Sequence, residues 1–157
     1  MDYEKKAEER QRYRELLEEL RTIIPGAQVL FAFLLTAPFA ARFHLVDFWG
    51  QLVFTISLLS VAAATILFLA PAAYHRLAGR RDRKGRLSFG VKSTLVGLLL
   101  LGLSISCAVF VIIRFMFNNT LLGVVFAITS GVMAFLLWYV HPLLNRKRTR
   151  DKSESQT

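Results

Sequence analysis

Four long stretches without a charged residue alternate with segments that hold all of the charge. The uncharged stretches cover residues 25–41, 48–74, 95–113 and 121–144. A helix needs about 20 mostly apolar residues to cross a hydrocarbon core about 30 Å thick. The chain of 157 residues is 54% hydrophobic, and a soluble domain of this size cannot bury so many apolar side chains. We therefore predict an all-α protein that forms a bundle of four transmembrane helices.

The distribution of basic residues predicts the orientation of this bundle. Lys and Arg together number 6 before the first stretch, 1 in the first link, 7 in the segment His75–Lys92, 1 in the second link and 5 after the last stretch, which accounts for all 20. Cytoplasmic loops of membrane proteins carry the excess of Lys and Arg. We therefore place both termini and the segment His75–Lys92 in the cytoplasm. Anionic lipid head groups are the expected partners of this segment, at about 1 kcal/mol for each nearby cation.

Three parts of the chain follow from these patterns. Residues 1–24 are predicted to form an amphipathic cytoplasmic helix, residues 25–144 the membrane domain, and residues 145–157 a disordered basic tail. The Pro-Gly pair at 25–26 marks the first boundary, because proline is tolerated in the first turn of a new helix. The predicted membrane helices cover about residues 25–43, 48–74, 93–114 and 120–144.

The N-terminal helix has one apolar face and is otherwise charged. This segment contains six Lys and Arg and seven acidic residues, so it lacks the basic excess of most membrane-surface helices. Three locations of this helix stay open: it docks on the bundle, it lies along the lipid surface, or it is solvated in the cytoplasm. The apolar face has helical spacing and comprises Tyr13, Leu16, Leu17, Leu20, Ile23 and Ile24.

Several classes of function lack the residues that they require. All 11 acidic residues lie outside the four uncharged stretches, whereas a cation-coupled transporter normally places a carboxylate at mid-membrane. His75 and His141 could approach each other if the second and fourth helices pack together, but two ligands do not complete a zinc site. Cys107 lies in an apolar stretch and is interpreted as packing. We therefore expect no enzyme activity, no metal and no cofactor. We also expect no nucleic-acid partner, because the positive charge lies in blocks between apolar stretches.

Small residues recur every four positions on three of the predicted helices. This spacing lets transmembrane helices approach closely, within one chain or between chains. The positions are Gly123, Ala127 and Gly131 on the fourth helix, Gly102 and Ser106 on the third, and Ser60 and Ala64 on the second.

Two segments, Leu16–Phe43 and Ala70–Leu77, carry a resemblance to a known family. The first holds a Glu-Leu-Arg segment before a helix with Gly26, Gln28 and a Phe-Leu-Leu-Thr run, and the second reads Pro-x-x-Tyr-His-Arg. These features resemble an uncharacterised family of small bacterial four-helix membrane proteins, a domain of unknown function. The likeness is good over the first half of the chain and rests on hydropathy in the second half. It implies a bacterial inner-membrane location and supplies no activity.

The residues of this resemblance suggest one candidate site. Under the predicted topology, five polar side chains fall near the cytoplasmic interface, either as a structural joint or as a small site for a lipid head group or anion. These are Arg21, Gln28, Tyr74, His75 and Arg76.

The sequence as a whole favours a non-enzymatic structural or accessory component of the membrane. We expect it to self-associate or to join a larger membrane complex. The alternative is a small transporter or channel subunit, for which the available mid-membrane polar material is a set of serine and threonine residues: Ser57, Ser60, Ser104, Ser106, Thr129 and Ser130.

Overall fold

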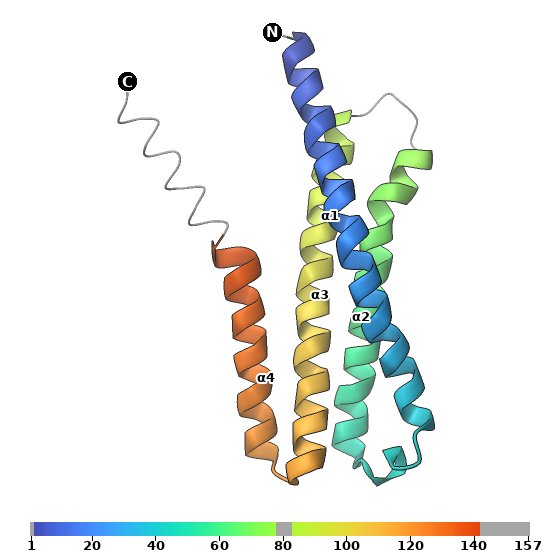
Figure 1. Cartoon of the computed structure of the whole chain (residues 1–157), viewed down its shortest axis with the longest axis vertical. Coiled ribbons are helices and arrows are strands. Elements are labelled where there is room, and N and C mark those ends of the chain that lie inside the picture. The colour runs from blue at the N-terminus through green and yellow to red at the C-terminus, as the bar shows by residue number, and fades with distance from the viewer. Residues whose placement is uncertain (1, 78–82, 142–157) are drawn as a thin grey trace, which may run out of the picture.

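The computed structural model describes residues 2–77 and 83–141. In these ranges each of four helices, counted with the turn that follows it, contains a segment long and apolar enough to cross a membrane, which confirms the predicted all-α class. In Figure 1, α1, α2 and α3 lie together, and α4 lies against α3 on the side away from α1 and α2. The helices are α1 (Asp2–Thr36), α2 (Phe48–Leu77), α3 (Arg83–Phe117) and α4 (Thr120–Phe135), which a π-helical turn, η3 (Leu136–Val140), continues.

The first difference from the prediction is that α1 runs unbroken through Pro25. A proline inside a helix removes one backbone hydrogen bond, here to the carbonyl of Arg21. Both Arg21 and Pro25 lie on the exposed face of α1, so the loss falls away from the core. On the opposite face Leu20 and Ala27 are each only 2% exposed. This buried stripe continues on both sides of Pro25, so packing keeps the helix in one piece.

The second difference lies at the other end of α1, which stops at Thr36 instead of reaching residue 43. Proline disfavours the helical conformation in the residue before it, and Pro38 falls in the next element, the short 3-10 helix η1 (Ala37–Phe39). A second 3-10 helix, η2 (Phe43–Leu45), leads into α2. The link between α1 and α2 is therefore longer than the sequence suggested.

The third difference concerns the basic segment His75–Lys92, which was expected to be a loop. The α3 helix already begins at Arg83, and α2 continues to Leu77. Residues 78–82 lie outside the described residues, as does the predicted basic tail at 145–157. The early start of α3 is supported by packing, because a Cβ atom at Gly90 would lie 3.4 Å from Leu16 of α1 and 3.6 Å from Pro71 of α2.

The centre of the fold is the antiparallel pair of α2 and α3, which share the most extensive helix–helix contact. Ser57 and Ser104 are both completely buried in it. Each hydroxyl donates to the backbone carbonyl of the other residue, at 2.7 and 2.8 Å, and the two hydroxyl oxygens are 3.1 Å apart. Nearer the basic end, the buried ring of Phe68 lies against Gly97. The reciprocal hydrogen bonds and the close fit of Phe68 against Gly97 together fix the register of α2 against α3.

The α4 helix packs on α3 through its small residues. A Cβ atom at Gly123 would lie 3.1 Å from the carbonyl oxygen of Phe110, and one at Gly131 would lie 3.0 Å from the hydroxyl of Ser106. On α3, Gly102 faces Trp138 in the same way, at 3.5 Å. The small-residue spacing on these two helices therefore serves packing within the chain.

We expect Gly97→Ala to destabilise the fold and Gly26→Ala to leave it intact. A Cβ atom at Gly97 would lie 2.5 Å from the buried Phe68 ring, whereas at Gly26 it would meet no atom within 4 Å. Overpacking of this kind costs about 1–3 kcal/mol, while alanine in an open helical position gains up to about 1 kcal/mol over glycine. Equilibrium unfolding in mixed micelles would measure both variants, and equal free energies of unfolding would contradict the tight contact.

Candidate functional site

The predicted interfacial cluster is only partly described, and its described members are not brought together by polar contacts. Arg21 and Gln28 lie on the exposed side of α1. Tyr74 is half-buried, and its ring lies against Phe89 of α3 with the ring centroids 5.2 Å apart. No hydrogen bond or ion pair links Arg21, Gln28 and Tyr74. The side chains of His75 and Arg76 lie outside the described residues, so the cluster stays a prediction.

The histidines and the cysteine do not form a centre in the part of the chain that the structure describes. The α3 helix lies between α2 and α4 (Figure 1), so the helix packing that would bring His75 and His141 together is not formed. His44 and His141 are exposed, and Cys107 is half-buried. Among the described residues, no three His, Cys, Asp or Glu side chains come close enough to hold a metal ion.

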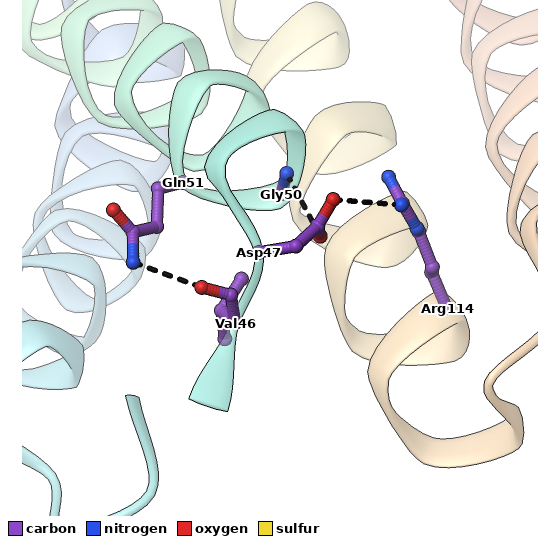
Figure 2. A network of polar contacts seen from close by, with 5 residues as sticks. All are labelled: Val46, Asp47, Gly50, Gln51 and Arg114. Atoms are coloured by element: carbon purple, nitrogen blue, oxygen red, sulfur yellow. Dashed lines mark hydrogen bonds and ion pairs between the residues drawn. The ribbon is translucent and has the colours of Figure 1, made fainter. Parts of the chain in front are cut away.

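A polar network that the sequence did not predict lies at the opposite end of the bundle, where α2 begins and α3 ends (Figure 2). Asp47 Oδ2 accepts a hydrogen bond from Arg114 Nη2 at 2.8 Å, which is also an ion pair. Asp47 Oδ1 accepts from the backbone N–H of Gly50 at 3.3 Å. Asp47 is thus the N-cap of α2 and the anchor of Arg114 at once.

Neighbouring groups hold both charges in place. Arg114 lies in the last turn of α3 and Asp47 precedes the first turn of α2, so each charge opposes the partial charge of its helix terminus. The guanidinium carbon of Arg114 lies 5.8 Å from the centroid of the Phe110 ring. Gln51 adds a hydrogen bond to the carbonyl of Val46 at 2.9 Å. The pair is only partly shielded, since the side chains of Arg114 and Asp47 are 25% and 49% exposed.

Two hollows adjoin at this network. A pocket of about 290 Å³ with a mixed polar and apolar surface contains Asp47, Arg114 and Asn118 in its wall. An open apolar groove of about 360 Å³ lies beside it and extends along α1 and α3, with Arg42 as the charged residue in its wall. Three residues line both hollows, namely Val46, Val111 and Phe115. A pocket with polar groups and an apolar groove side by side can bind an amphiphile, and we name this region the link-end site.

Sequence reasoning missed this site although one signal was present. Asp47 and Arg114 are the acidic and basic residues nearest to the start of the second and the end of the third apolar stretch. Consecutive antiparallel helices bring these two ends together. The pairing of Asp47 with Arg114 could therefore be expected from the four-helix topology, because the start of the second helix lies beside the end of the third.

Comparison with known proteins identifies a family whose function is not known. The model of a family of unknown function, DUF6328, matches residues 3–142. The match extends over both halves of the membrane domain, so the likeness is not limited to the first half. No curated protein and no solved structure matches the chain.

We expect two substitutions of Asp47 to separate its two roles. Asparagine is also a good N-cap, so Asp47→Asn should keep the cap and lose the charge of Asp47, at a cost of about 0.5–1 kcal/mol for a partly exposed ion pair. Asp47→Ala should cost about 1 kcal/mol more, because the N–H of Gly50 also loses its partner. Unfolding free energies in mixed micelles would measure this difference.

Arg114→Gln provides the control for this experiment. It should destabilise the wild-type chain and have little further effect in the Asp47→Asn background, because the ion pair is already absent there. Equal effects of Arg114→Gln in both backgrounds would show that the two charges do not interact.

Proposed function

The chain belongs to this family of unknown function, and we propose from its own residues that it is a non-enzymatic structural or accessory component of a bacterial inner membrane. The observation that carries the proposal is the state of its buried polar groups. Throughout the described ranges, no buried side-chain nitrogen or oxygen lacks a hydrogen-bond partner. A conduit for ions or solutes needs polar groups that are free to replace water.

The serine and threonine residues at mid-membrane illustrate this point. Ser57 and Ser104 satisfy each other. Ser106 donates to the carbonyl of Gly102 at 2.9 Å, and Thr129 donates to the carbonyl of Val125 at 2.8 Å. These hydroxyls hold helices together or bond to the preceding helical turn. This arrangement favours a packed scaffold over the alternative of a small transporter or channel subunit.

The orientation of the scaffold belongs to the same proposal. The link-end site carries one acid and two basic residues, Asp47, Arg42 and Arg114, whereas the N-terminal segment and the region from His75 to Lys92 carry 6 and 7 basic residues. By the positive-inside rule the link-end site faces away from the cytoplasm and both termini face the cytoplasm. The basic end then meets anionic head groups, and the exposed apolar helix faces are available to a second copy or a larger complex.

Cysteine labelling in intact cells would test this orientation. In a Cys107→Ser background, His44→Cys and Asn118→Cys should react with a membrane-impermeant maleimide, because they lie in the two outer links. Ser153→Cys in the C-terminal tail should react only after the membrane is permeabilised, and Val125→Cys within α4 should stay unreactive. Labelling of position 153 in intact cells would reverse the proposed orientation.

Flux measurements would test the choice between scaffold and transporter. The full chain reconstituted into liposomes should leave proton and potassium leakage at the level of protein-free liposomes, since the hydroxyls of Ser57, Ser104 and Ser106 already have hydrogen-bond partners. Protein-dependent flux that is lost in the Ser57→Ala variant would contradict the scaffold and favour the alternative.

A further inference from the structure

The apolar groove at the link-end site lies between α1 and α3. It extends from Leu30 of α1 to Ala37 of η1. Ala108 and Ile112 of α3 form its opposite wall. Its surface is almost entirely apolar, and it is open along the side of the bundle. In a membrane-spanning chain the open side of the groove faces the hydrocarbon of the bilayer, so lipid acyl chains can enter it.

One basic residue, Arg42, lines this groove through the apolar stem of its side chain, since the groove surface is almost entirely apolar. Arg42 is exposed, and its guanidinium makes no hydrogen bond or ion pair within the described ranges. It lies in the link that follows α1, at the end of the bundle that also holds the turn between α3 and α4 (Figure 1). A guanidinium at the membrane interface is well suited to bind a phosphate through charge-assisted hydrogen bonds.

In a second copy that packs in parallel, no described acidic side chain is placed to pair with Arg42. In a parallel arrangement the same end of the neighbour would meet Arg42, and Asp47, the acid on the link side of the bundle, already binds Arg114. The acids of α1 end at Glu19, about 25 Å along the helix axis from Thr36. The other acidic residues of α1 lie still further from the link, and Asp82, Asp151 and Glu154 lie outside the described residues. Charge complementarity therefore favours a lipid.

We propose that the groove is a phospholipid-binding site that takes one acyl chain between α1 and α3 and the lipid phosphate on Arg42. The adjoining pocket beside Asp47 gives room for the rest of the head group. The site requires that the chain spans a membrane, but it does not depend on the direction in which it does so. Reversed topology would move the site to the other leaflet and leave the binding unchanged.

The phosphate contact can be tested with the full chain in an uncharged detergent. The probe is phosphatidylcholine with a fluorescent acyl chain, since its zero net charge limits binding to the basic segments. Arg42→Ala should weaken its binding about tenfold, as expected for loss of one charge-assisted hydrogen-bonded contact, while Arg42→Lys should retain most of the affinity. The uncharged methyl ester of the same labelled acyl chain should bind both variants and the wild type equally.

The acyl-chain contact has a matched pair of variants at neighbouring positions. Ala40 lines the groove and Ala41 does not, and both are exposed. Ala40→Trp should fill the groove and weaken both probes several-fold, whereas Ala41→Trp should weaken neither. Circular dichroism would verify that each variant keeps the helical content of the wild type.

Three outcomes would overturn the proposal. The first is binding of phosphatidylcholine that Arg42→Ala leaves unchanged. The second is an equal loss of affinity in Ala40→Trp and Ala41→Trp, because the groove would then not be the site. The third is an equal loss of the phospholipid and of the methyl ester in Arg42→Ala, because the arginine would then support the shape of the link and not the phosphate.

Discussion

The register of α2 against α3 is the constraint on which the rest of the structure depends. Two contacts fix it. The reciprocal hydrogen bonds of Ser57 and Ser104 hold one part of the interface, and the fit of Phe68 against Gly97 holds another. Inside a membrane there is no hydrophobic force between helices, so packing and interhelical hydrogen bonds must select the register. A slip of one residue would leave two hydroxyls without partners and place the phenyl ring against a larger side chain.

The other helices take their positions from this pair. The α1 helix contributes a stripe of buried residues spaced by seven, Leu20, Ala27 and Leu34. The α4 helix packs on α3 through glycines. Gly123 also brings α4 close to Arg114, because a Cβ atom at Gly123 would lie 3.3 Å from the Cβ atom of Arg114. Because Asp47 lies at the start of α2, the same register decides that its carboxylate meets Arg114. The link-end site is thus a consequence of packing at mid-membrane.

The sequence predicted the number and approximate places of the membrane helices, because hydropathy and charge act locally along the chain. It did not predict that α1 passes through Pro25, since this depends on which face of the helix is buried, nor that α3 starts at Arg83. The ion pair of Asp47 with Arg114 was missed for a related reason. Both charges are visible at helix ends, but their distance depends on the register of α2 and α3. The five-residue interfacial cluster remains a prediction, because two of its side chains are not described.

The groove is explained by where the helices end. The α1 helix stops at Thr36, because Pro38 disfavours its continuation, whereas α3 continues to Phe117. The link that replaces the missing turns of α1 lines the space with small side chains, Ala37 and Ala40, which cannot fill it. In water such an apolar hollow would be costly to expose. In a bilayer it costs little, because a hydrocarbon chain fills it and restores the dispersion contacts that an empty space would lose. An apolar hollow that an acyl chain can fill, with the apolar stem of Arg42 in its wall, is therefore compatible with a stable fold in a membrane.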